Sequence, residues 1–448
     1  MRVDRGAQLL LAGVVLFGLT IAVSAAVAPD RGHVGGTAAG ESPQTLVGSQ
    51  GGGAGWHEYG SVYLLNGTDV AWREGSADSY FDVQRLNNGN VLAGFMHNGY
   101  ERCGPYDSPC ARTGYRIIDP DASGGPTVVD EYSFPVRTQK NSEVHDAEPL
   151  PGGGFVMTDM DRERIVVVRD EQVVWQWNAS SVYDAPADPT TTDWLHVNDV
   201  DRIGDGRFLV SVRNANQLVV VQRTADGGSE VVEIINADAA GSSDASCRGG
   251  GQLRDTDGDG DVRCGDPDVL NHQHNPQWLG AGAVLVADSD NDRVVELHRG
   301  DDGNWSVAWT LTEAAGLELR WPRDADRLPN GNTLITDTLN KRIVEVDENG
   351  TVVWRYATER IPYEADRVPR ELRGDGLPRM NADGDAAGTP EAGDDTAPEG
   401  GVPVLSSLVV LVRAAAPWAP VWFAEPQVAA TLVSLALVIA GAVVSVRD

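Results

Sequence analysis

Short apolar runs that end in Gly, Asn or Pro residues alternate with polar positions along most of the chain. Runs rich in Val, Ile and Trp between such turns are typical of β-strands joined by hairpins. One unit recurs: an acidic or polar approach, an aliphatic residue, a Gly/Asn turn and an apolar run. Its copies read FDVQRLNNGNVLAGF from Phe81, HDAEPLPGGGFVMTD from His145, HVNDVDRIGDGRFLVSV from His196, HNPQWLGAGAVLVAD from His274 and RDADRLPNGNTLITD from Arg323.

Further strand patterns follow most copies, and some third strands carry Trp, as in VVWQW ending at Trp177. A period of roughly 40–50 residues with about four strands per repeat is typical of a propeller blade. IPYEADRVP, from Ile361, begins a sixth copy, and strand patterns at 61–72 lack an opening of their own. We therefore predict an all-β fold, a six-bladed β-propeller over 56–377, with seven blades as the alternative. Both ends of the domain would share the sixth blade and so hide its sheet edges.

Apolar segments lie at both ends of the chain. Residues 1–30, with Arg2 and Arg5 ahead of the apolar run, predict a signal anchor, or alternatively a cleaved signal peptide. A transmembrane helix is predicted at 428–446, within a hydrophobic region at 402–448. Because the arginines stay in the cytoplasm, we expect a cell-membrane protein with its propeller outside the cytoplasm.

Three other stretches interrupt the strand pattern. The Gly/Ser-rich residues 31–55 and the acidic residues 378–401 have the composition of flexible linkers. Residues 241–268 form an insertion within the propeller. The predicted architecture is thus one β domain linked at both ends to membrane-directed segments.

The charge balance narrows the possible partners. The chain has 66 acidic against 35 basic residues, a formal net charge of −31, and Lys140 and Lys341 are its two lysines. Nucleic-acid binding needs a basic surface, so this class is excluded. An acidic, lysine-poor surface resembles those of halophilic, archaeal proteins. A hydrophobic content of 41% opposes a disordered acidic chain.

The four cysteines fall into two close pairs, Cys103 with Cys110 and Cys247 with Cys264. In an exported protein this spacing favours two local disulfides. A zinc site formed by all four is the alternative, although no CxxC pair is present.

The insertion carries an Asp-rich run. Alternating carboxylates at these spacings suit Ca²⁺, as in an EF-hand loop, with Gly260 at the sharp turn. The closing ligand is Asp where that motif has Glu, and the alternative is a solvated acidic loop. We expect a structural Ca²⁺ and no cofactor required for catalysis. The candidate ligands are Asp255, Asp257, Asp259, Asp261 and Asp266.

Histidines recur at one place in the repeat. His145 and His274 directly precede the acidic or Asn position of their copies, and Arg323 takes the same place in the last copy. His196 and His272 stand three residues before that position. Because successive blades are related by rotation, we expect these residues to converge at one mouth of the central channel. The alternative is that each histidine bonds structurally between blades.

The phrases HDAEPLPGGG, DWLHVNDVD…VSVRN and HQHNPQ resemble the arylsulfate sulfotransferase family, six-bladed propellers that move a sulfuryl group between phenols. The resemblance covers His145 to Tyr356. It implies that His274 is the nucleophile and that His145 is a further pocket histidine. It also implies that His196, Asn198 and Arg213 hold the transferred group. The family's separate N-terminal β domain has no counterpart here, and LGAGAVLVAD replaces its usual Pro-Asn-Gly-Asn turn.

The residue types suit this chemistry. Transfer of a sulfuryl group resembles loose phosphoryl transfer, so catalysis consists of positioning and charge stabilisation. A neutral histidine can attack sulfur, other histidines can move the phenol proton, and an arginine fork fits sulfate oxygens. The expected partners are an aryl sulfate and a phenol, with His272 and Arg323 as further binding residues. The alternatives are a surface-anchored binding or scaffold propeller, and a hydrolase or lyase that uses the same mouth, which a histidine-bound metal would favour.

Overall fold

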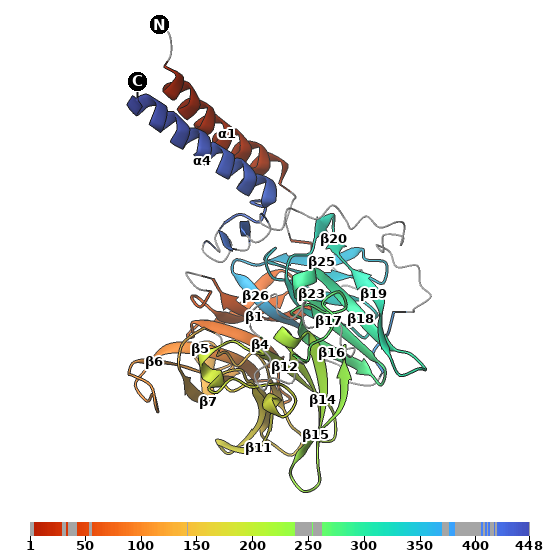
Figure 1. The fold of residues 1–448 in the computed structure, drawn as a ribbon. Helices are drawn as coiled ribbons and strands as arrows, with labels where there is room; N and C mark the ends of the chain where they lie inside the picture. Colours follow the sequence, from red (N-terminus) through yellow and green to blue (C-terminus); the bar gives the residue numbers. More distant parts are fainter. Residues whose placement is uncertain are drawn as a thin grey trace. The chain divides into compact units, whose positions relative to one another are not determined.

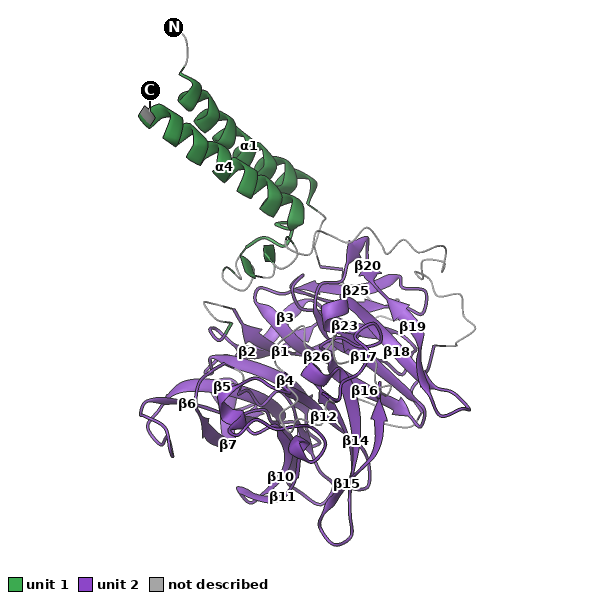
Figure 2. Cartoon of the chain, in the orientation of Figure 1, with its two compact units in different colours: residues 1–31, 53–56, 390–448 green, residues 32–52, 57–389 purple. Residues whose placement is uncertain are grey.

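A computed structural model of the chain describes residues 4–28, 33–34, 43–52, 56–140, 142–237, 253, 262–369, 376–380, 405, 408–409, 411–412, 416 and 419–447. The chain divides into two compact units, one of residues 32–52 and 57–389, the other of 1–31, 53–56 and 390–448 (Figure 2). The first is the six-bladed β-propeller that the repeats predict (Figure 1).

Every blade is a four-stranded antiparallel sheet. Blade 1 contains β26 (Ile361–Val368), β1 (Gln44–Gly51), β2 (Ser61–Asn66) and β3 (Asp69–Glu74). Blade 2 contains β4 (Ser79–Arg85), β5 (Val91–Tyr100), β6 (Cys110–Asp119) and β7 (Thr127–Val136). Blade 3 contains β8 (Ala147–Pro149), β9 (Phe155–Asp159), β10 (Arg164–Arg169) and β11 (Gln172–Asn178).

Blade 4 contains β12 (Val197–Gly204), β13 (Arg207–Val212), β14 (Gln217–Arg223) and β15 (Ser229–Ile235). Blade 5 contains β16 (His274–Gly280), β17 (Ala283–Asp288), β18 (Arg293–Arg299) and β19 (Trp305–Leu311). A short hairpin of β20 (Glu313–Ala314) and β21 (Leu317–Glu318) leads to blade 6, which contains β22 (Pro322–Arg327), β23 (Thr333–Asp337), β24 (Arg342–Val346) and β25 (Val352–Ala357). The first strands of neighbouring blades contact one another around the axis.

Blade 1 closes the ring with strands from both ends of the domain. β26 pairs with β1, from Gln44↔Val368 to Gly51↔Ile361. The sequence assigns 31–55 to a flexible linker, and this is wrong for β1, whose residues after Gln44 are all buried. Leu46 and Val47 supply its apolar contacts, and Gly48 permits close approach, since a Cβ there would lie 1.9 Å from the Phe81 carbonyl oxygen. The Gly, Ser and Gln content of this stretch conceals the strand.

A repeated ion pair explains the similar turns between second and third strands. The last residue of the second strand is Asp and the first of the third is Arg in blades 3, 5 and 6. The Nε–Oδ2 distances are 2.7 Å for Arg164–Asp159, 2.7 Å for Arg293–Asp288 and 2.6 Å for Arg342–Asp337. All three aspartates are buried. In blades 5 and 6 the arginine also binds a neighbouring segment, through the carbonyl oxygens of Asp268 and Ala314.

The second unit contains two helices, α1 (Arg5–Val27) and α4 (Glu425–Arg447). Both helices are long enough and apolar enough to cross a membrane, with mean hydropathies of 2.5 and 2.4. This supports an anchoring role for the segments at the two ends of the chain. They pack against each other as an antiparallel pair (Figure 1). A Cβ at Gly13 would lie 2.7 Å from the Ser434 carbonyl oxygen, so glycine allows this close contact.

One predicted disulfide is confirmed and the other is partly visible. Cys103 is bonded to Cys110. Cys264 is also disulfide-bonded, while its expected partner Cys247 lies outside the described residues. Four of the five candidate calcium ligands, Asp255, Asp257, Asp259 and Asp261, also lie outside them. Asp266 is described, and its Oδ1 accepts from the Asp268 N–H at 2.9 Å, so calcium binding at this loop stays a prediction.

Candidate functional site

Three positions on the inner strands, or just before them, recur from blade to blade and build the site. The mouth position is occupied, from blade 2 round to blade 1, by Phe81, His145, Asn198, His274, Arg323 and Tyr363. The rim position, two residues earlier, is occupied by Ser79, Glu143, His196, His272, Trp321 and Ile361. The ring position, one residue after the mouth position, is occupied by Asp82, Asp146, Asp199, Asn275, Asp324 and Glu364.

Tyr363 and His145 form the centre of the mouth. The His145 ring stacks on Tyr363, with centroids 5.3 Å apart, and on His196 at 5.2 Å. The His274 ring meets the edge of Tyr363 at 6.3 Å, and the Arg323 guanidinium lies over Tyr363 at 5.1 Å. The predicted convergence of His145, His196, His274 and Arg323 at one place is therefore what the structure shows.

Hydrogen bonds assign the tautomer of His274. Its Nδ1 lies 3.1 Å from the His272 carbonyl oxygen and 2.8 Å from Ser289 Oγ. Ser289 Oγ donates its proton to the Pro322 carbonyl oxygen at 2.6 Å, so both neighbours of Nδ1 are acceptors. Nδ1 therefore carries the proton, and Nε2 holds a lone pair. Burial, together with the charges of Arg323 and Arg213, lowers the pKa of His274 well below its usual value and keeps the ring neutral.

Histidine–carboxylate pairs lie around the buried rings of His145 and His274. His196 Nδ1 lies 2.8 Å from Asp193 Oδ1, and His272 Nδ1 lies 2.6 Å from Asp290 Oδ2. A carboxylate that holds one ring nitrogen fixes the orientation of the ring and leaves the other nitrogen for proton transfer. In both His196 and His272, Nε2 is therefore the nitrogen available for proton transfer.

A third pair involves His57, which the repeats do not reveal. His57 Nε2 lies 3.2 Å from Glu143 Oε1, and its Nδ1 lies 2.9 Å from Ser79 Oγ. Burial of Glu143 opposes its ionisation, but the hydrogen bond from His57 and the nearby imidazole rings outweigh burial and hold the pKa of Glu143 far below its usual range. Glu143 thus brings a buried negative charge to the rim.

Two arginines, Arg323 and Arg213, bring positive charge to the mouth beside this negative charge. Arg323 is buried, lies over Trp321 at 4.3 Å and donates to Gln50 Oε1 through Nη1. Arg213 begins a 3-10 turn after β13 and donates to Asn214 Oδ1 at 2.7 Å, while its buried Nε has no hydrogen-bond partner among the described residues. Burial and the charge of Arg213 lower the pKa of Arg323, although Tyr363 and Glu143 act in the opposite direction. The mouth therefore concentrates cationic N–H donors where an anion can bind.

The rim position has an unusual backbone. His196, His272 and Trp321 have φ values of +57°, +48° and +50°, which are uncommon for residues other than glycine. The preceding blade holds each N–H: His196 donates to Glu163 Oε1 at 2.8 Å, His272 to Asn216 Oδ1 at 3.0 Å and Trp321 to Asp292 Oδ1 at 2.7 Å. Interblade hydrogen bonds thus enforce the conformation that aims the rim side chains.

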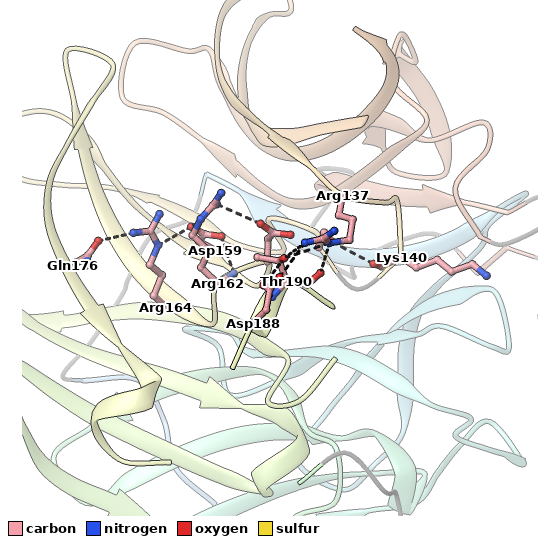
Figure 3. A network of polar contacts seen from close by, with 10 residues as sticks. Arg137, Lys140, Asp159, Arg162, Arg164, Gln176, Asp188 and Thr190 are labelled. Atoms are coloured by element: carbon pink, nitrogen blue, oxygen red, sulfur yellow. Dashed lines mark hydrogen bonds and ion pairs between the residues drawn. The ribbon is translucent and has the colours of Figure 1, made fainter. Parts of the chain in front are cut away.

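The loop before β12 is fixed from its far side. Figure 3 shows Arg137, which follows β7, donating to Asp188 Oδ2 at 3.1 Å and to Thr190 Oγ1 at 2.9 Å. In the same view Arg164 links Asp159 and Gln176 within blade 3. Because Asp193 and His196 follow this loop directly, these contacts help to position the pair.

The ring position has a different chemistry. Its carboxylates accept backbone N–H groups of the next blade: Asp82 from Ala147 at 3.3 Å, Asp146 from Val200 at 2.7 Å and Asp324 from Ala365 at 3.0 Å. This pattern joins the inner strands of adjacent blades. The acidic positions of the sequence repeat thus have a structural role.

The predicted residues lie at the mouth position, at the rim position and, for Arg213, in the 3-10 turn after β13. His145, His274, Asn198 and Arg323 stand at the mouth position, and His196 and His272 at the rim. The side-chain N–H of Asn198 donates to the Gln273 carbonyl oxygen at 2.9 Å. The Asn198 Oδ1 is buried and has no hydrogen-bond partner among the described residues. Sequence reasoning missed His57, Glu143, Asp193, Asp290, Trp321 and Tyr363. Of these, Glu143, Trp321 and Tyr363 share the repeat spacing and could have been found by aligning the copies.

Metal binding at the mouth finds no support in this arrangement. No group of three or more His, Cys, Asp or Glu side chains within the described part of the chain is placed to hold a metal ion. His145 and His196 stack face to face, and stacked rings do not aim their nitrogens at a common point.

No family model matches the chain, and no curated protein matches its sequence. Solved structures do match. A Bacteroides caccae protein of unknown function has 14% identity and a TM-score of 0.46 over 73% of this chain and 99% of its own. A periplasmic gluconolactonase of Pseudomonas aeruginosa has 12% identity and a TM-score of 0.42 over the same shares. A virginiamycin B lyase of Staphylococcus aureus has 11% identity and a TM-score of 0.34 over 61% and 69%. At these sequence identities and TM-scores, the matches say nothing about the activity of this protein.

Proposed function

We propose that this protein is a membrane-anchored arylsulfate sulfotransferase that transfers a sulfuryl group from an aryl sulfate to a phenol through His274. The supporting observation is the state of His274: the ring is protonated at Nδ1, and burial and the charges of Arg323 and Arg213 keep it neutral, with a lone pair on Nε2. A neutral imidazole is the nucleophilic form, and fixed positive charge stabilises the oxygens of the group in flight.

In the first half-reaction, Nε2 of His274 attacks sulfur, the N–S bond forms and the bond between sulfur and the aryl oxygen breaks. The electron pair leaves with the aryl oxygen, and His196, protonated at Nε2, gives that oxygen a proton. Asp193 keeps the proton at Nδ1 of His196 and so directs Nε2 to this role.

In the second half-reaction, the acceptor phenol gives its proton to Nε2 of His196. The phenolate oxygen attacks sulfur, the N–S bond breaks and the lone pair returns to His274. Arg213 and Arg323 hold the sulfuryl oxygens in both steps, and the buried hydroxyl of Tyr363, which no described residue hydrogen-bonds, supplies a further donor.

The test uses the full-length protein in detergent and high salt. 4-Nitrophenyl sulfate is added with and without phenol, release of nitrophenol is followed, and intact protein is weighed for an added sulfuryl group. We expect acceptor-dependent release and labelling of His274. His274→Ala should reduce transfer by about 10³-fold or more. His298→Gln, at a histidine in the outer part of blade 5, serves as the matched control and should keep full activity.

Other outcomes would redirect the proposal. Release without phenol would indicate a sulfatase. A folded protein that releases nothing from several aryl sulfates would favour a binding propeller, and full activity in His274→Ala would remove the assigned nucleophile.

A further inference from the structure

The channel next to the mouth is lined by acidic side chains. A cavity of about 30 Å³ is surrounded by eight carboxylates, and no Lys, Arg or His is among the described residues that line it. Five of the carboxylates stand at the ring position, and the other three are Glu148, Asp201 and Asp326. Like charges gathered around so small a volume repel one another, and the repulsion is stronger where water is scarce. Such a cavity therefore favours a bound positive charge.

Two oxygens in this lining differ from the rest. Asp199 Oδ2 and Asn275 Oδ1 are buried without a hydrogen bond from any described residue, and the two residues are only 8% and 9% exposed. They stand at the ring position of neighbouring blades, where Asp82, Asp146 and Asp324 receive backbone N–H groups. An amide oxygen and a carboxylate oxygen can only accept, and a buried acceptor without a donor destabilises the fold unless something else binds it.

We propose that this cavity binds a divalent metal cation, coordinated by the Asp199 carboxylate and the Asn275 amide oxygen and otherwise by water. No three acidic, His or Cys side chains of the described residues are placed to ligate an ion directly. A cation of the Mg²⁺ type fits this limit, because it is held by one or two carboxylates and keeps several waters. The volume admits about two water-sized particles, so part of the water shell contacts the ring carboxylates.

This site is separate from the proposed reaction and does not depend on it. Its distinguishing feature is Asn275, which interrupts the acidic series in blade 5. An amide oxygen binds a hard cation without adding to the local negative charge. The ion would link blades 4 and 5 at the level where other neighbouring blades are joined by carboxylate–backbone hydrogen bonds.

The test measures thermal unfolding of the full-length protein in detergent, after metal removal by a chelator, in choline chloride. We expect MgCl₂ or CaCl₂ to raise Tm in a saturable manner and KCl of equal ionic strength to have no such effect. Asp199→Asn, which is nearly isosteric, should weaken this response at least tenfold. Asp302→Asn, at a solvent-exposed turn between β18 and β19, is the control and should respond like the unchanged protein.

A second variant keeps the test independent of any folding defect in the first. Asn275→Asp adds a ninth carboxylate, so it should lower the metal-free Tm and tighten metal binding. Metal content after gel filtration should fall in Asp199→Asn.

Three results would overturn the proposal. An equal divalent response in Asp199→Asn would place the ions elsewhere, for instance at the loop of Asp255 to Asp266. An equal rise with choline or potassium would mean general screening. Indifference to all cations together with a Tm that rises on acidification would mean that protons neutralise the ring.

Discussion

The mouth and the ring of the propeller channel lie one residue apart in each repeat, and they carry different kinds of side chain. His145 precedes Asp146, and Arg323 precedes Asp324. Burial lowers the pKa of His145 well below the usual value of a histidine. Burial, together with the charges of Asp146 and Asp201, raises the pKa of Asp199 well above the usual value of an aspartate. Burial disfavours charge at both levels. Successive side chains of a strand point to opposite faces, so one strand can serve two kinds of site.

The two levels also differ in their partners. Rim histidines bond to carboxylate side chains, as in His196–Asp193 and His272–Asp290, and mouth residues such as Asn198 and His274 bond to carbonyl oxygens. Ring carboxylates bond to the backbone of the next blade. We therefore expect changes at the mouth to affect chemistry and changes at the ring to affect stability.

A pair of adjacent substitutions should separate these roles most strongly. Arg323→Gln removes a donor and a charge from the proposed sulfuryl site, and we expect transfer to fall by about 10²–10³-fold. Asp324→Asn should keep activity per folded molecule but lower the free energy of unfolding by about 1–3 kcal/mol, because its Oδ2 accepts from Ala365 and Thr336. Kinetics and urea unfolding of both variants provide the measurements.

Arg169→Gln, at an exposed arginine at the end of β10, is the control for loss of a positive charge. Loss of transfer in Asp324→Asn equal to that in Arg323→Gln, at full folding, would contradict the division between the levels.

The pH dependence of stability should carry the signature of the mouth. His145 and His274 stay neutral when folded, whereas an unfolded histidine binds a proton near pH 6.5. The unfolded state then binds more protons below about pH 6.5, so stability falls as the pH falls. Each group contributes at most about 1.4 kcal/mol per pH unit.

His145→Phe should remove one of the two contributions while keeping an aromatic ring in the stack, as Phe81 does in blade 2. The difference in unfolding free energy between this variant and the unchanged protein should therefore change steadily between pH 6.5 and pH 5. All carboxylates other than those near residue 145 titrate alike in both proteins. Parallel curves over this interval would show that His145 is not held neutral.

The repeat pattern was sufficient to predict the architecture, because each blade repeats the same turns and inner-strand residues. It also predicted the meeting of His145, His196, His274 and Arg323, since rotation places equal repeat positions together. It could not predict β1, whose Gly, Ser and Gln residues lack a strand signature. That segment is a strand because it pairs on one side with β2 and on the other with β26, which lies more than 300 residues away in the chain.

Partners of the site residues were harder to predict than the residues themselves. His57 lies outside the repeats, and its pairing with Glu143 brings the segment between β1 and β2 of blade 1 against the segment that precedes β8 of blade 3. Asp193 belongs to a loop that Arg137 holds from another blade. Nothing in local sequence specifies such contacts. Tyr363 was within reach, because the truncated copy IPYEADRVP aligns it with His145 and Arg323.

Tyr363→Phe should give the smallest but most discriminating effect. The Tyr363 hydroxyl is fully buried, and no described residue hydrogen-bonds it, so its removal should leave the free energy of unfolding unchanged or raise it by up to about 1 kcal/mol. The ring remains to stack on His145 and to contact Arg323. If the hydroxyl donates to the sulfuryl group, transfer should fall about tenfold in the same variant, a loss of about 1.4 kcal/mol of transition-state stabilisation. Unfolding midpoints and initial rates on 4-nitrophenyl sulfate measure the two effects. A structural hydroxyl would give the opposite combination, lower stability with normal turnover, and would remove Tyr363 from the site.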